Sequence, residues 1–195
     1  MSDPKAAREP SVLALVYTDA NAADGVLAQL AMALMERDVA LAGLVQHNAP
    51  RPGRSRCDMV LEDLGSGTHV AISQDRGPQA RGCMLDLGQL LSASMLVEQS
   101  LANNPDVVIL NKFGKSEAEG GGFRELIGKV IESGSALVIA VPWRNIESWR
   151  AFAGEGGHEV ALDATPHALS ALLAHLGYPD DASEAPLPAR PRFDA

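Results

Sequence analysis

The sequence predicts an α/β domain built on a doubly wound, mostly parallel sheet with an inserted antiparallel hairpin. Apolar runs recur along the chain at Val12 to Val16, Leu41 to Gln46, Val107 to Leu110 and Ala136 to Val141. Nearly continuous apolar runs are typical of strands covered on both faces, as in parallel sheets. Helical patterns separate most of these runs, and this alternation predicts helices on both faces of the sheet.

Each helical segment has its own pattern. The predicted helices are Asp24–Arg37, Asp86–Ala102, Phe123–Ser133 and Pro166–Leu176. The first and third carry an apolar stripe that repeats every 3.6 residues. Gly134 predicts the end of the third helix, because glycine favours the left-handed conformation that closes helices. Thr165 is the predicted N-cap of the fourth, with Pro166 as its first residue.

The pattern changes between Cys57 and Gln74. Met59 to Leu64 and His69 to Ser73 alternate between apolar and polar residues around Gly65-Ser66-Gly67. Alternation on both sides of a glycine-rich turn predicts a β-hairpin. The hairpin falls between the second and third parallel strands.

The length of 195 residues predicts one domain, over residues 12–177, and 46% apolar residues supply its core. Residues 1–11 are expected to be a flexible N-terminus without the apolar segment of a signal peptide, and Val12 to Tyr17 is too short to span a bilayer. Residues 178–195 are rich in proline and acidic residues, which predicts a disordered tail. We expect a cytoplasmic protein that does not insert into membranes.

The charge balance limits the partners. The formal net charge is -9, which argues against nucleic acid and acidic membrane surfaces. A small ligand is the expected partner, and a homo-oligomer is compatible with the sequence.

The first turn after a strand, here Thr18 to Gly25 (TDANAADG), is the usual phosphate cradle of such sheets. A P-loop would read GxxxxGK followed by Ser or Thr, and this turn lacks that lysine. The candidate ligand-binding residues in it are Thr18, Asp19, Asn21, Asp24 and Gly25. The alternative is that Asn21 or Asp24 only caps the following helix.

The third apolar strand leads into NKFGKSEAEGGGF, from Asn111 to Phe123. Polar residues at the carboxyl end of a strand lie at the ligand edge of the sheet. A working Walker B strand would end in acidic residues that hold magnesium and position water, whereas Asn111 and Lys112 stand there. The alternative is a turn residue followed by a flexible glycine loop. The candidates from this part of the chain are Asn111, Lys112, Gly114, Lys115, Glu117 and, after the fourth strand, Arg144.

These segments resemble a bacterial family called domain of unknown function 2478, which is similar to thermophile-type nucleoside-triphosphatases. The resemblance covers Val12 to Leu176 and is carried by RCDMVLEDLGSG, GCMLD and NKFGKSEAEGGGF. It implies a sheet of the P-loop NTPase type, with the phosphate loop at Thr18 to Gly25 and an acidic segment at Asn111 to Glu117. Gly114, Lys115 and Glu117 match that segment, while Asn111 and Lys112 depart from it. The resemblance also implies a link to molybdenum uptake.

Cys57 and Cys83 each follow arginine within two residues, and cationic neighbours lower the pKa of a thiol. With His47 they are candidate ligands for a soft metal, although cysteine is more often a small buried filler. Trp143 and Trp149 flank Arg144, either to stack on a ring or with one tryptophan in the core and the other on the surface.

Three functions therefore remain open. The favoured one is a non-catalytic or regulatory binder of a nucleotide, with or without magnesium, or of an oxyanion such as molybdate, on degenerate Walker A and B motifs. The second is a divergent nucleoside-triphosphatase with magnesium held by Asp19, Asp24 and Glu117. The third is a metal or redox sensor that uses the Cys57 and Cys83 thiols.

Overall fold

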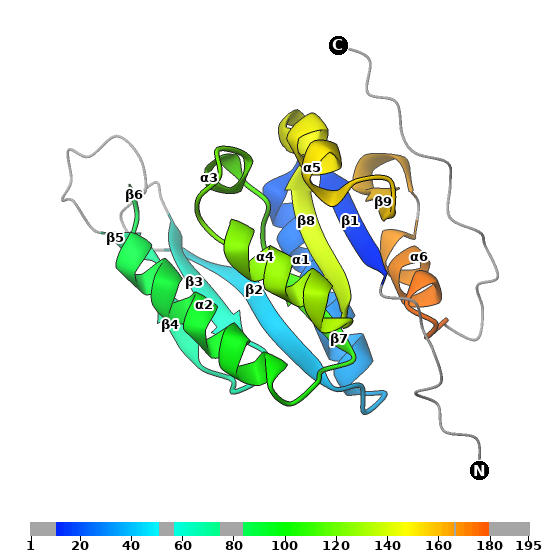
Figure 1. Cartoon of the computed structure of the whole chain (residues 1–195), viewed down its shortest axis with the longest axis horizontal. Helices are drawn as coiled ribbons and strands as arrows, with labels where there is room; N and C mark the ends of the chain where they lie inside the picture. Colours follow the sequence, from blue (N-terminus) through cyan, green and yellow to red (C-terminus); the bar gives the residue numbers. More distant parts are fainter. Residues whose placement is uncertain (1–10, 51–56, 75–83, 166, 180–195) are drawn as a thin grey trace.

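The computed structural model describes residues 11–50, 57–74, 84–165 and 167–179. Within them, seven strands form one sheet in the order β4-β3-β2-β7-β8-β1-β9, with helices on both faces (Figure 1). This confirms the predicted α/β class and the mostly parallel sheet. The predictions for the two ends of the chain fall almost wholly outside the described residues.

Five strands make the parallel part of the sheet. They are β1 (Val12–Tyr17), β2 (Leu41–Pro50), β7 (Val107–Leu110), β8 (Ala136–Pro142) and β9 (Gly157–Ala161). All but β9 were predicted from apolar runs. The sequence analysis missed β9 because His158 and Glu159 interrupt its apolar pattern, although it pairs in parallel with β1.

The hairpin extends the sheet beyond β2. Strand β3 (Cys57–Asp63) pairs antiparallel with β2 and with β4 (His69–Ala71), as the alternating pattern predicts. The buried carboxylate of Asp63 fixes the turn by accepting hydrogen bonds from the backbone and the hydroxyl of Ser66. Two short strands, β5 (Ser73–Gln74) and β6 (Met84–Leu85), form a separate pair.

The described residues form six helices: four begin and end within four residues of their predicted bounds, and α3 and α5 were not predicted. They are α1 (Ala20–Met35), α2 (Leu87–Leu101), α3 (Lys115–Ala118), α4 (Arg124–Ser133), α5 (Ile146–Ala153) and α6 (Ala168–His175), with 3-10 turns η1 (Trp143–Asn145) and η2 (Leu162–Ala164). Gly134 closes α4 with φ +78°, as predicted. Thr165 was wrong as the N-cap of α6, because η2 runs up to it and the helix begins only after His167.

The sheet separates two apolar cores. One contains Leu110 and Trp149 and lies between the sheet and helices α2, α4 and α5. The other contains Leu15 and Leu27 and lies between the sheet and helices α1 and α6. In Figure 1, α2 and α4 cover the face toward the viewer and α1 lies behind the sheet. Within the described residues, no helix has the length and apolar character needed to cross a membrane.

The chain leaves β1 and β8 toward opposite faces. Strands β1 and β8 are parallel neighbours, yet α1 packs in one core and α5 in the other. Ligands of open α/β sheets bind beyond the carboxyl ends of strands at such a switch point. We call the carboxyl ends of β1, β2, β7 and β8 the switch-point edge; α3 and α5 flank it (Figure 1).

Candidate functional site

The connection between β1 and α1 is shorter than expected. The prediction of a turn from Thr18 to Gly25 was wrong: β1 ends at Tyr17, α1 begins at Ala20, and Asn21, Asp24 and Gly25 are helical. Only two residues, Thr18 and Asp19, link the strand to the helix. Such a link has no loop long enough to wrap around a phosphate.

Asp19 occupies the N-terminus of α1. It is the N-cap, and its Oδ1 accepts hydrogen bonds from the backbone N–H groups of Asn21 (2.8 Å) and Ala22 (3.2 Å). Helix N-termini attract anions because their first N–H groups are unpaired. Here the carboxylate of Asp19 already takes two of them. The hydroxyl of Thr18 donates to Oδ2 of Asp163 at 2.6 Å, away from the helix.

Asp24 is the centre of a network at the switch-point edge. Its Oδ1 accepts a hydrogen bond from Nδ2 of Asn111 (2.6 Å), and its Oδ2 accepts one from Nδ2 of Asn48 (2.8 Å). Oδ1 of Asn48 in turn accepts from Nε2 of Gln46 (3.0 Å). The structure thus brings together Asp24 and Asn111, both predicted for the site, and Oδ1 of a third predicted residue, Asn21, lies 3.5 Å from Nδ2 of Asn48. Sequence reasoning missed Asn48, although it follows the apolar run of the second strand at the same edge.

In this network only the nitrogen of the Asn111 side-chain amide has a hydrogen-bond partner. The residue is only 3% exposed, and its Oδ1 has no hydrogen-bond partner among the described residues. Its amide cannot be turned over, because Oδ1 would then face the carboxylate of Asp24. An unpaired buried acceptor costs about 1–3 kcal/mol, so a residue in this state calls for an explanation. A ligand that donates a hydrogen bond to Oδ1 would supply the missing partner.

Tyr17 reports the electrostatics of this edge. The pKa of its phenol is raised to about 12, chiefly by burial and then by the charge of Asp24, while the charge of Arg144 lowers it. The pKa of Tyr17 therefore depends on the charges of two residues predicted for the site, Asp24 from α1 and Arg144 from η1. The guanidinium of Arg144 and the ammonium of Lys112 have no ion-pair partner in the part of the chain that the structure describes.

Glu117 holds the loop after β7 together. It is 5% exposed, its Oε2 accepts a hydrogen bond from the N–H of Gly114, and its Oε1 accepts one from the N–H of Phe123, both at 2.8 Å. A Cβ at Gly122, where φ is +56°, would collide with the same carboxylate. Both oxygens of Glu117 are therefore used by the backbone of its own loop.

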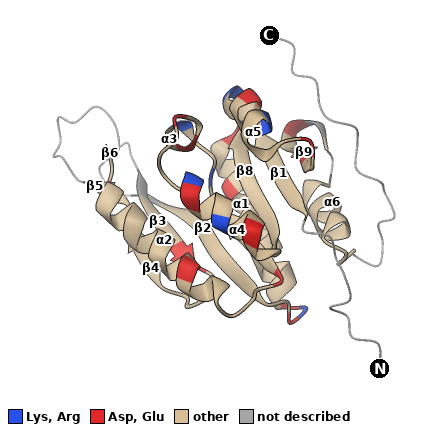
Figure 2. Cartoon of the chain, in the orientation of Figure 1, with Lys and Arg blue, Asp and Glu red and all other residues tan. Residues whose placement is uncertain are grey.

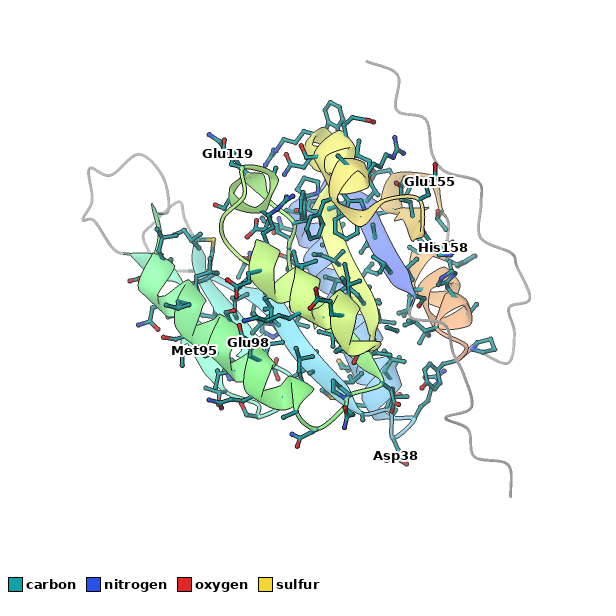
Figure 3. All side chains as sticks on the ribbon, viewed as in Figure 1. Asp38, Met95, Glu98, Glu119, Glu155 and His158 are labelled. Atoms are coloured by element: carbon teal, nitrogen blue, oxygen red, sulfur yellow. The ribbon has the colours of Figure 1, made fainter. Side chains whose placement is uncertain are left out.

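Lys115 lies on the surface, as the first residue of α3. Its side chain is 82% exposed and lies 3.6 Å from the carboxylate of Glu119, one turn further along α3. Figure 3 labels Glu119 on the outer side of that helix. Charged residues gather on α3, α5 and the segment around β9, so acidic and basic groups are mixed around this end of the sheet (Figure 2).

The two tryptophans are divided between core and surface, as one of the two predictions had it. Trp149 is 1% exposed and stacks edge to face on Phe113 at 5.3 Å between ring centroids. Trp143 is 45% exposed and precedes Arg144 in η1.

The thiol hypothesis stays a prediction. Cys83 lies outside the described residues, and Cys57 is the first residue of β3 with its side chain not described. The third candidate metal ligand, His47, lies on β2, where Nε2 is 2.7 Å from Oε2 of Glu62.

Residues 12–169 match the model of a family described as "Protein of unknown function (DUF2478)". The chain belongs to this family. In this DUF2478 member the matched segment contains all five parallel strands, the Asp24 network and the Glu117 loop. The chain is also 33% identical over 143 residues to the molybdenum import ATP-binding protein ModC 2 of Bradyrhizobium diazoefficiens. That match spans 73% of the chain but only 16% of the relative. No solved structure matches the DUF2478 chain significantly.

Proposed function

We propose that this DUF2478 chain binds a nucleotide at the switch-point edge and does not hydrolyse it. The observation that carries the proposal is the buried Asn111, whose Oδ1 lacks a partner while its Nδ2 is fixed on Asp24. The amide oxygen calls for a donor from the ligand. Lys112 directly follows Asn111, and Arg144 directly follows the exposed Trp143 in the chain. Neither cation has an ion-pair partner among the described residues, and an anion that carries a flat ring would suit this combination.

The same observation favours a nucleotide over a bare oxyanion. A nucleotide carries negative phosphates together with hydroxyl and N–H donors on its ribose and base. Fully deprotonated molybdate offers only acceptors and would leave Oδ1 of Asn111 unpaired. The similarity to a relative named as an ATP-binding protein supports the nucleotide further.

The strand order and the polar residues at the switch-point edge also bear on the type of sheet. We infer a sheet of the P-loop type whose phosphate loop has shrunk to Thr18 and Asp19. Helices on both faces and polar residues after β1 and β7 are compatible with this origin.

The hydrogen bonds argue against hydrolysis. Phosphoryl transfer needs cationic groups on the phosphates, and a carboxylate or amide that orients the attacking water. The P-loop lysine is absent from the sequence. Asp19 caps α1, Glu117 accepts two backbone N–H groups, and both oxygens of Asp24 accept amide N–H groups. The carboxylates that a magnesium site would use are thus engaged within the protein.

Isothermal titration of the full chain with ATP, ADP, GTP and molybdate tests the proposal. We expect heat with at least one nucleotide and a loss of affinity of about 10-fold in Asn111→Ala, which corresponds to about 1.4 kcal/mol. Asn103→Ala is the matched control, because Asn103 is exposed in the turn after α2. Binding of molybdate alone, or equal affinities in the two variants, would contradict the proposal.

A second measurement addresses turnover. Phosphate release from ATP or GTP with magnesium is expected to stay at the level of a protein-free blank. Release that is abolished in Asp24→Asn would instead support the nucleoside-triphosphatase hypothesis.

A further inference from the structure

A second polar cluster lies on the antiparallel extension of the sheet. It consists of His47 on β2, Glu62 on β3 and His69 on β4, one residue from each of three neighbouring strands. One ligand atom from each residue lies within 4.8 Å of the other two. We call these residues the His–Glu–His cluster.

Strand register places the cluster on one face of the sheet. Glu62 is directly opposite His69, and His47 is opposite Val60, which is two residues from Glu62 on the same strand. Residues two apart on a strand point to the same face. The three side chains therefore project together, with Nε2 of His47 2.7 Å from Oε2 of Glu62 and the two imidazole centroids 6.1 Å apart.

The donor set suits a borderline transition-metal ion. Two imidazoles and one carboxylate are the protein ligands of open zinc sites, which complete their coordination with water. Ligand atoms about 2.0–2.1 Å from a tetrahedral ion lie roughly 3.4 Å apart. Separations of up to 4.8 Å would have to close by at most about 1.4 Å, and the 2.7 Å between Nε2 of His47 and Oε2 of Glu62 would have to open by about 0.7 Å. Side-chain rotation supplies such shifts in half-exposed residues.

The cluster is open to the solvent. The side chain of His47 is 44% exposed and that of Glu62 is 30% exposed, and His69 is also on the surface. An ion therefore reaches the ligands without unfolding, and a free coordination position faces water. A hydrogen bond between His47 and Glu62 alone would explain that pair but not the addition of a second imidazole from β4.

We propose that the His–Glu–His cluster is a binding site for one divalent ion of the zinc, cobalt and nickel class. The ion would join β2, β3 and the short edge strand β4. His47 lies between Gln46 and Asn48 on β2, but the cluster shares no residue with the Asp24 network, and the proposal does not depend on nucleotide binding.

The test is a titration of the full chain, stripped of metal by a chelator, with zinc and with cobalt against a chromophoric chelator. We expect one ion per chain, and a cobalt spectrum that shows nitrogen and oxygen ligands. His47→Ala and His69→Ala should each weaken binding by about 100-fold or more, since even residues that only support metal ligands contribute roughly 10- to 100-fold. Glu62→Gln should weaken it as well.

A second histidine pair is the matched control. His158 and His175 have ring centroids 4.3 Å apart, but the described residues bring no third ligand close to them. Figure 3 labels His158 beside α6. His158→Ala is expected to leave the affinity unchanged. Thermal unfolding without metal shows that the variants fold.

Three outcomes would overturn the proposal. The first is binding weaker than the competing chelator can detect. The second is an equal loss in His47→Ala and His158→Ala, which marks nonspecific binding to surface histidines. The third is a thiolate-to-cobalt charge-transfer band that disappears in a Cys57→Ser, Cys83→Ser double variant while His47→Ala still binds.

Discussion

The parallel and antiparallel parts of the sheet differ in how far their polar side chains are exposed to water. In the parallel part both faces are covered by helices, and buried polar groups such as Glu117 and Glu159 are paired. In the antiparallel extension, His47 and His69 project from a face that stays open to water. An unpaired atom such as Oδ1 of Asn111 is therefore informative in the covered part, because water does not satisfy it. On that open face, only the convergence of several donors is informative.

The largest expected effect tests a buried carboxylate of the covered part. Glu117→Ala leaves the N–H groups of Gly114 and Phe123 without their acceptor. We expect a loss of about 4 kcal/mol in the free energy of unfolding, since each hydrogen bond to a charged group contributes about 1.5–3 kcal/mol. Urea denaturation measures it. Lys115→Ala, two residues away and exposed, should stay within about 0.5 kcal/mol. Equal losses in the two variants would contradict the assignment of Glu117 as a loop anchor.

The second-largest effect concerns the buried ion pair on β9, the outer strand of the sheet on the side away from β4. Nε and Nη2 of Arg150 donate to the two carboxylate oxygens of Glu159 at 2.9 and 2.7 Å, and the Glu159 side chain is 2% exposed. Glu159→Ala should cost about 3 kcal/mol, because breaking a buried pair costs about 3–5 kcal/mol and Arg150 retains some access to water. Chemical denaturation checks the value, and a loss below about 1 kcal/mol would show that the pair behaves like a surface contact.

Asn111→Asp puts a second carboxylate beside Asp24. We expect a loss of about 2 kcal/mol near neutral pH, because a hydrogen bond is replaced by like-charge repulsion. The repulsion raises the pKa of the pair in the folded state above the unfolded value. The contribution of this pair to stability is therefore complete at low pH and is lost as the pH rises through the raised pKa. Denaturation at several pH values checks this, and a wild-type profile would contradict the contact between Asp24 and residue 111.

In the open part of the sheet the corresponding change is small. Glu62→Gln removes the carboxylate next to His47, and without metal we expect a change within about 0.5 kcal/mol, as for exposed pairs. The same denaturation in the presence of zinc should separate the wild type from the variant, because a bound ion stabilises only the state that holds it. A large loss without metal would mean that this face is more enclosed than its exposure indicates.

The smallest expected effect is a dependence of the free energy of unfolding on pH, caused by His175. Burial, and secondarily the neighbouring His158, lower the pKa of His175 below its ordinary value. The unfolded chain then binds a proton at a higher pH than the folded chain. Stability is complete above the unfolded pKa of about 6.5 and falls as the pH drops toward the lower folded value. His175→Gln should flatten this part of the profile. Parallel slopes in wild type and variant would exclude His175 as the source.

Much of the covered part follows from the sequence. Runs such as Val107 to Leu110 and the stripe of Asp24 to Arg37 predict strands and a helix, because a covered strand or helix needs apolar side chains. The meeting of Asp24 and Asn111 was also within reach, since the carboxyl ends of parallel strands share one edge. Strand β9 was missed because its two polar residues conceal a short buried strand.

The details of the two sites were harder to predict. Glu117 reads as a candidate ligand, and only the folded loop shows that Gly114 and Phe123 occupy its oxygens. The His–Glu–His cluster depends on the register of two antiparallel pairings. The alternation of apolar and polar residues indicates which face Glu62 takes, but it does not say that His47 lies opposite Val60 and His69 opposite Glu62.

The two-residue link between β1 and α1 limits what this protein can distinguish. A nucleotide bound beyond it, as proposed, would be held through its ring and by the charges of Lys112 and Arg144, without a loop around its phosphate chain. Mono-, di- and triphosphates of one base would then occupy the protein about equally. The bound fraction would then depend on the total concentration of that nucleotide, and not on the ratio of its triphosphate to its diphosphate.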